Sequence, residues 1–120
     1  MKKILVVDDE EPMRNLLRDL LSGSYEVSLA EDGRKALTLL AGNTFDLLIT
    51  DVMMPELDGV ELVTYIREKN KQLKIIAISG GGKTGVFEFL PIVKLLGADI
   101  TFNKPFDINE VKATVNRLLA

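Results

Sequence analysis

Carboxylates follow two short apolar segments of the chain, where they could act as metal ligands or as nucleophiles. Asp8 and Asp9 come directly after the β-branched segment Ile4–Val7, and Asp51 comes directly after Leu47–Thr50. Short apolar segments bounded by polar residues are typical of buried β-strands. A single Asp after a strand is also a common turn residue that bonds its own backbone. The chemical interpretation therefore depends on whether these carboxylates meet in space.

Two other polar side chains also follow predicted strands. Ser79 ends the apolar segment Leu73–Ile78, and Lys104 ends the more polar segment Asp99–Asn103. A hydroxyl and a compact ammonium group can both bind phosphoryl oxygens. In open α/β sheets, ligands bind at the edge where the strands have their carboxyl ends. The side chains expected at this one edge are Asp8, Asp9, Asp51, Ser79 and Lys104.

The three carboxylates of Asp8, Asp9 and Asp51 predict a magnesium site. Converging carboxylates repel one another, and a hard divalent cation with oxygen ligands relieves this repulsion. Mg²⁺ typically binds one or two carboxylates together with water and phosphate oxygens. An Asp carboxylate can also attack phosphorus and form an aspartyl phosphate. Because the chain has no His to serve as phosphodonor, the phosphoryl group must come from another molecule, which favours an acceptor protein over an enzyme.

Helical patterns separate the predicted strands. Apolar residues recur at helical spacing after Pro12, and similar patterns follow Gly33 and Gly59, cover 87–96 and begin again at Ile108. The half-exposed segment Val27–Leu29 supplies the remaining strand. Five strands alternating with five helices predict a parallel sheet covered by helices on both faces. We therefore expect a single α/β domain over residues 1–120.

Composition excludes several classes of function. The 120 residues carry a net charge of −3, so the chain has no basic surface of the kind that binds nucleic acid. It contains neither Cys nor His, which excludes disulfides, thiolate metal sites and Ser-His hydrolases. The apolar segment after Lys2 and Lys3 is too short for a signal peptide, and no segment predicts a membrane span. We expect a cytoplasmic protein that binds neither nucleic acid nor membranes.

The combined pattern resembles the receiver domain of bacterial two-component response regulators. The resemblance covers the whole chain and rests on Asp8-Asp9, Asp51, Met53-Met54-Pro55, Asp58-Gly59, Ser79, Gly97-Ala98-Asp99 and Lys104-Pro105-Phe106. It implies a flavodoxin-like three-layer (βα)5 fold with strand order 2-1-3-4-5. It also implies that a sensor histidine kinase or a phosphotransfer protein supplies the phosphoryl group.

The resemblance assigns a role to each candidate residue. Asp51 would be the phosphoacceptor, and Asp8, Asp9 and the backbone carbonyl of Met53 would organise Mg²⁺ with it. Ser79 and Lys104 would hold the phosphoryl oxygens. A cis peptide between Lys104 and Pro105 is a further expectation from the same resemblance.

The chain ends soon after its last predicted helix, at Ala120, so the expectation is a single-domain regulator. Such a protein would signal through phosphorylation-dependent protein contacts, as a monomer or as a phosphorylation-dependent dimer. Its own chemistry would be limited to phosphorylation from small donors and slow dephosphorylation. A phosphotransfer protein, a kinase and another regulator all stay open as downstream targets.

Two positions depart from the receiver pattern. Thr101 stands where receivers carry Tyr or Phe, and the stretch between Ser79 and Lys104 is longer than in comparable receivers, most naturally in the loop Gly80–Gly85. Strand alternation places Phe102 on the face opposite Thr101, so we expect Phe102 to be a core residue. The conformational response to phosphorylation is then predicted in Gly80–Gly85 and the start of the next helix.

A nucleotide-binding protein is the alternative. Ala77–Thr84 fits a relaxed phosphate-loop pattern, with Ala in place of the first Gly, between a predicted strand and helix. The replaced Gly, the short chain and the position of Asp51 before the loop argue against it. Calorimetric titration with MgATP and MgGTP, repeated on Lys83→Ala, separates the two interpretations.

Overall fold

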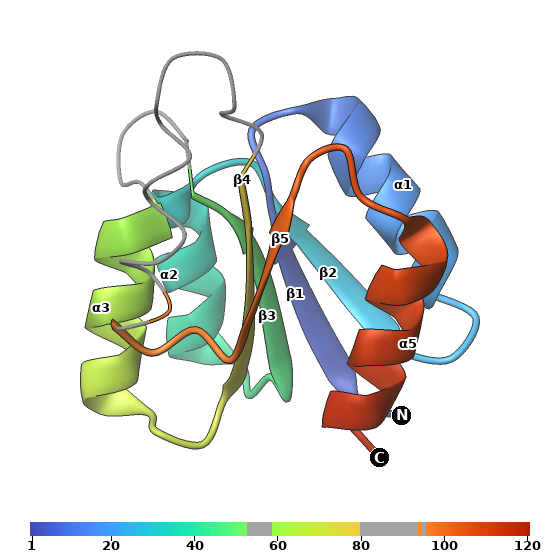
Figure 1. The fold of residues 1–120 in the computed structure, drawn as a ribbon. Coiled ribbons are helices and arrows are strands. Elements are labelled where there is room, and N and C mark those ends of the chain that lie inside the picture. The colour runs from blue at the N-terminus through green and yellow to red at the C-terminus, as the bar shows by residue number, and fades with distance from the viewer. Residues whose placement is uncertain (53–58, 80–93, 95) are drawn as a thin grey trace.

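Five parallel strands form one sheet in a computed structural model that describes residues 1–52, 59–79, 94 and 96–120 (Figure 1). Their order is β2-β1-β3-β4-β5, and every neighbouring pair is parallel. The predicted strand order is therefore confirmed. The strands are β1 (Lys3–Val7), β2 (Glu26–Ala30), β3 (Leu47–Asp51), β4 (Lys74–Ser79) and β5 (Ile100–Asn103).

Helices cover both faces of the sheet, which gives the three-layer arrangement expected from the sequence. Figure 1 shows α1 and α5 on one face and α2 and α3 on the other. The helices are α1 (Glu11–Leu21), α2 (Gly33–Gly42), α3 (Gly59–Lys69) and α5 (Ile108–Leu118). The helix predicted over 87–96 lies outside the described residues, apart from Lys94 and Leu96, which are helical. Within the described residues, no helix is long and apolar enough to cross a membrane.

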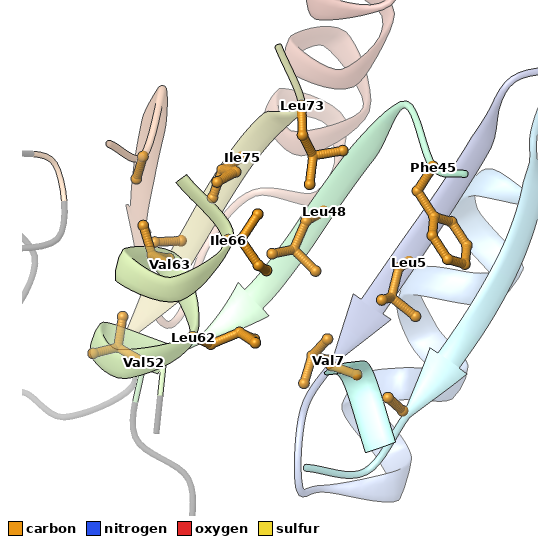
Figure 2. Close-up of a cluster of buried hydrophobic side chains, with 14 residues drawn as sticks. Leu5, Val7, Phe45, Leu48, Val52, Leu62, Val63, Ile66, Leu73 and Ile75 are labelled. Carbon is orange, nitrogen blue, oxygen red and sulfur yellow. The ribbon is translucent and has the colours of Figure 1, made fainter. Parts of the chain in front are cut away.

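Alternating residues of the central strands fill two separate apolar layers. Leu5, Leu48 and Ile75 face α2 and α3, where they pack with Leu62 and Ile66 (Figure 2). Their neighbours along the strands face α1 and α5 and form the second layer. That layer contains Ile4, Val6, Leu47, Ile49, Ile76 and Ile78. Because both faces are covered, β1, β3 and β4 are almost continuously apolar, as the sequence predicts.

Local sequence signals set the helix starts. Pro12 lies in the first turn of α1, where its missing N–H breaks no helical hydrogen bond. The Asp32 carboxylate accepts a hydrogen bond from the Lys35 N–H at 2.9 Å and caps α2. Asp107 caps α5 in the same way through the Asn109 N–H.

Side chains of β5 alternate as predicted. Phe102 and Ile100 are half-buried and pack on the layer that faces α1 and α5. The Phe102 ring also contacts Phe106, with ring centroids 6.3 Å apart. Thr101 pairs in register with Ala77, which belongs to the other layer. Phe102 therefore supports the core and does not stand in for an aromatic side chain at position 101.

Arg67 joins α3 to the starts of β4 and β5, at the edge of the sheet opposite the candidate site. Its guanidinium donates to the Gly97 carbonyl at 2.7 and 3.1 Å and to the Leu73 carbonyl at 2.7 Å. It also lies 3.3 Å from the Asp99 carboxylate, which accepts the Ile75 N–H at 2.8 Å. One planar side chain thus satisfies backbone acceptors from two loops.

Replacing Arg67 with Ala is expected to lower the free energy of unfolding by about 2–4 kcal/mol, because partly buried carbonyls lose their donors. Arg67→Lys should recover only part of this loss, since one ammonium group cannot reach both loops as the guanidinium does. Urea unfolding measures the effect. Arg18→Ala removes an exposed Arg that pairs with Asp19 and should change stability by less than about 0.5 kcal/mol. Equal losses in the two Ala variants would contradict the proposed role of Arg67.

Candidate functional site

The β1–α1 loop presents two neighbouring carboxylates that differ in burial. The Asp8 N–H donates to the Ala30 carbonyl at 3.1 Å, which extends the pairing of β1 with β2 by one residue. This bond holds Asp8 at the sheet edge, where only 2% of it is exposed, while Asp9 is exposed. The Asp8 Oδ1 accepts the Glu10 N–H at 2.9 Å, which fixes the orientation of the carboxylate.

β3 and β4 bring Asp51 and Ser79 to the same edge. Asp51 is the last residue of β3 and Ser79 the last of β4, and both are buried. The Val52 N–H donates to the Ile78 carbonyl at 2.8 Å, so the two strands stay paired up to the site. The Lys104 N–H then donates to the Ser79 carbonyl at 2.7 Å, which places the β5–α5 loop beside β4.

Lys104 places its ammonium group among the carboxylates at this edge of the sheet. Its Nζ lies 3.1 Å from the Asp51 Oδ2 and 3.2 Å from the Asp8 Oδ2. A third carboxylate, that of Glu10, lies 3.5 Å from the same Nζ. The structure therefore brings together four of the predicted residues through direct contacts or backbone pairing: Asp8, Asp51, Ser79 and Lys104. The Lys104–Pro105 peptide is cis, as expected.

Asp9 completes a group of three carboxylates with the chemistry of a metal site. One carboxylate oxygen from each of Asp8, Asp9 and Asp51 lies within 4.8 Å of the other two. Oxygen ligands with this much negative charge suit a hard cation such as Mg²⁺. Lys104 contributes one positive charge to the group, so the three acids keep a net negative charge that a divalent cation would neutralise. The donor set therefore fits magnesium.

Charge and burial shift the pKa values of two groups in the site. Burial is the largest influence on Asp8 and raises its pKa from 3.8 to about 6, against the opposing effect of the Glu10 N–H. The neighbouring charge of Asp51 raises the pKa of Asp8 as well, and Lys104 lowers it. For Lys104, burial would lower the pKa, but Asp51 and Asp8 together outweigh burial and raise it. Lys104 therefore stays positively charged at neutral pH.

Comparison with known families identifies this arrangement. The family model described as the response regulator receiver domain matches residues 4–116. The chain belongs to the response regulator receiver family. Receiver domains are signalling domains that accept phosphoryl groups from histidine kinases, so the resemblance stated from the sequence is confirmed.

Relatives of this receiver domain include regulators and a kinase. It is 40% identical over 118 residues to the response regulator MprA of Mycolicibacterium vanbaalenii, covering 98% of this chain and 50% of that protein. It is 38% identical over 122 residues to the sensor histidine kinase TmoS of Ectopseudomonas mendocina, covering 98% of this chain and 12% of that protein. The chain thus spans half or less of these two relatives.

A solved receiver structure bears on the metal site. The response regulator TrrA of Thermotoga maritima, solved in complex with Mg²⁺ and BeF, matches with a TM-score of 0.84 and 36% identity. The match covers 98% of this chain and 99% of that one. The family match over residues 4–116 also includes the Ala77–Thr84 segment, on which the nucleotide-binding alternative was based.

Two predictions about the receiver site fall on residues that the structure does not describe. The backbone carbonyl of Met53, expected as a metal ligand, lies outside the described residues. The same holds for Gly80–Gly85, where we expect the conformational response to phosphorylation. The structural argument therefore rests on the contacts of Lys104 with Asp8 and Asp51, on the backbone pairing of Ser79 and on the position of Asp9.

The structure adds two residues that the sequence analysis did not single out. Glu10 contacts Lys104, and the Arg14 guanidinium donates to the Asp8 carbonyl at 2.8 Å, which ties α1 to the peptide between Asp8 and Asp9. One local feature sets Glu10 apart, namely its residue type at the start of a helix. It lies at the N-cap of α1, where Ser, Thr, Asp or Asn would be the ordinary choice.

Asp8→Asn is expected to stabilise the metal-free receiver domain at neutral pH. Because the pKa of Asp8 is raised on folding, the stability that it contributes is full below pH about 4 and is lost as the pH rises through about 6. Asn resembles the protonated acid and avoids this loss. In EDTA at pH 7.5, the free energy of unfolding of the Asp8→Asn variant should exceed that of the wild type by about 1–3 kcal/mol.

Urea unfolding at pH 4.5 and pH 7.5 checks both the size and the sign of the effect. At pH 4.5 most of the difference between Asp8→Asn and the wild type should disappear. Asp19→Asn, which removes an exposed carboxylate beside Arg18, should show little difference at either pH. An Asp8→Asn variant that is less stable than the wild type at pH 7.5 would show that the buried charge is not a cost.

Proposed function

We propose that this receiver domain accepts a phosphoryl group on Asp51 in a Mg²⁺-dependent reaction and signals through phosphorylation-dependent protein contacts. The observation that carries the proposal is the contact of Asp51 with Lys104, at 3.1 Å, inside a group of three carboxylates. A sensor histidine kinase or a phosphotransfer protein is the proposed donor, in keeping with the family.

Asp51 is the best-supported acceptor among the three acids. It is buried at the end of β3, the central strand of the sheet, and its Oδ2 lies 3.1 Å from the Lys104 Nζ. Asp9 is exposed and has no such buried position. The resemblance to receiver domains also implies that Asp51 is the phosphoacceptor.

Asp8, Asp9 and Asp51 would hold Mg²⁺, with the Met53 carbonyl as a further expected ligand. When bound, the ion supplies positive charge that offsets repulsion between the carboxylates and an incoming phosphoryl group. The donor set of three clustered carboxylates supports this assignment. The complex of TrrA with Mg²⁺ and BeF shows that a relative with 36% identity binds this metal.

Lys104 and Ser79 are proposed to bind the phosphoryl oxygens. Lys104 is 15% exposed, so its ammonium group acts where water screens charge less than it does at the surface. The Ser79 hydroxyl can donate one hydrogen bond, and its backbone carbonyl keeps Lys104 in place through the 2.7 Å bond from the Lys104 N–H. Together the two residues would favour a bound phosphoryl group over free phosphate in solution.

Incubation with Mg²⁺ and acetyl phosphate, followed by intact mass spectrometry, tests the proposal. The expected result is the gain of a single phosphoryl group that depends on Mg²⁺. A chain that stays unmodified under these conditions, while a known receiver domain in the same buffer is modified, would contradict the proposed function.

A further inference from the structure

Glu10 occupies a helix N-cap without capping the helix. Its backbone is extended, with φ −100° and ψ 119°, and its side chain makes no capping hydrogen bond to α1. A Glu side chain is also poorly suited to this position, which favours shorter polar residues. The Glu10 carboxylate is therefore not engaged in stabilising the start of α1.

The Glu10 carboxylate instead contacts the cation of the site. Its Oε1 lies 3.5 Å from the Nζ of Lys104, across the space between the β1–α1 loop and the β5–α5 loop. Lys104 thus contacts three acids, namely Asp8, Asp51 and Glu10. Asp8 and Asp51 are the proposed metal ligands, and Glu10 is outside that set.

Exposure places Glu10 at the solvent side of the site. Its side chain is 64% exposed, compared with 15% for Lys104 and 2% for Asp8. Of the three acids that contact Lys104, Glu10 is therefore the most exposed, and its negative charge is the one most accessible to an anionic phosphodonor in solvent. Glu10 also competes directly with the donor for that ammonium group, because its carboxylate already contacts Nζ.

We propose that Glu10 is a specificity-determining residue that disfavours small, free anionic phosphodonors by occupying Lys104 and repelling their charge. A protein donor is held by its own docking contacts and depends less on attraction at this point. The inference rests on the proposed function, since it requires Asp51 to be phosphorylated. It concerns only the selection of the donor and leaves the acceptor chemistry unchanged.

The reaction that Glu10 would control is balanced for acetyl phosphate as follows. An oxygen of the Asp51 carboxylate forms a bond to phosphorus, and the bond from phosphorus to the acetyl oxygen breaks. The acetate leaves with the bonding electron pair, and no proton is transferred. Lys104, freed from Glu10, would contact the phosphoryl oxygens during this step.

Glu10→Gln is expected to accelerate phosphorylation by acetyl phosphate about three- to tenfold at low ionic strength, because one negative charge near a dianionic donor is removed. The substitution keeps the backbone N–H that donates to Asp8, so the position of the metal-ligand candidate is preserved. Rates are measured by intact mass spectrometry at saturating Mg²⁺. The ratio of the Glu10→Gln rate to the wild-type rate should fall towards one in high salt, where the repulsion between Glu10 and the donor is screened.

Glu11→Gln is the matched control. Glu11 is the next residue, is also exposed and carries the same charge, but its carboxylate makes no ion pair with Lys104 in the described structure. We expect a markedly smaller acceleration from this variant. A donor with less negative charge, phosphoramidate, should also show a smaller ratio of Glu10→Gln to wild-type rates than acetyl phosphate does.

The outcomes separate this inference from the proposed function. If the wild type is phosphorylated and Glu10→Gln reacts as fast as the wild type with each of the two donors, the proposed role of Glu10 is wrong while the proposed function stands. Equal acceleration in Glu10→Gln and Glu11→Gln would likewise reject the contact with Lys104 as the cause. If neither wild type nor variant is modified by either donor, both the proposed function and the inference fail.

Discussion

Replacing Asp51 with Asn is expected to abolish phosphorylation by acetyl phosphate, because an amide lacks the anionic oxygen that attacks phosphorus. The substitution preserves the size of the side chain at the end of β3, and Lys104 can still donate to the amide oxygen. Intact mass spectrometry in Mg²⁺ should show full modification of the wild type and none of Asp51→Asn. In EDTA the wild type should also stay unmodified.

Two other variants show whether this loss is specific. Asp46→Asn makes the same chemical change at the residue before β3, at the opposite edge of the sheet, where the carboxylate accepts the Lys3 N–H. It should be phosphorylated like the wild type. Lys104→Met should slow the reaction about 10²–10³-fold, since it removes the positive charge beside Asp51. A phosphoryl adduct that persists in Asp51→Asn would mean that another acid is the acceptor.

The sequence predicted the sheet and most of the site for a definite physical reason. Strands buried on both faces are nearly continuous apolar segments, so their ends could be located from Asp8, Asp51 and Ser79. Parallel strands place those ends at one edge, which made convergence of the side chains a consequence of the fold. The 3.1 Å contact of Lys104 with Asp51 therefore confirms a relation that the strand pattern alone had indicated.

The sequence could not predict contacts that depend on side-chain direction between distant segments. Glu10 and Lys104 are 94 positions apart, and nothing in the acidic stretch shows which carboxylate turns towards the lysine. The links of Arg67 to Gly97 and Asp99 are similar, since they join loops whose approach only the folded sheet defines. Periodicity reports which face of an element is buried, whereas these contacts lie at loop ends outside any periodic pattern.

Gly59, which follows β3 in the chain, is another residue whose packing the sequence could not predict. From the sequence, it is a turn residue that precedes a helix. In the structure it is buried as the first residue of α3, and its N–H donates to the Val52 carbonyl at 2.9 Å. A Cβ added here would meet the backbone carbonyl oxygen of Asp51 and lie 2.6 Å from the Cα of Val52. Gly59 is therefore required for the close approach of α3 to the end of β3.

Gly59→Ala is expected to lower the free energy of unfolding by about 3 kcal/mol or more, because backbone atoms on both sides must move apart. The movement would displace Asp51 from its neighbours. In protein that remains folded, phosphorylation should be slowed more than about tenfold, since small displacements at a reacting group cost much of its rate. Urea unfolding measures the first effect, and intact mass spectrometry in native buffer measures the second.

Gly42→Ala is the matched control for Gly59→Ala. Gly42 ends α2, and a Cβ placed on it has no atom within 4 Å. Ala there should leave phosphorylation unchanged and stabilise the chain by up to about 1 kcal/mol, because Ala favours the helical backbone over Gly. If Gly59→Ala proved as stable and as reactive as Gly42→Ala, β3 and α3 could separate without cost. The contact with the Asp51 backbone would then not constrain the position of Asp51.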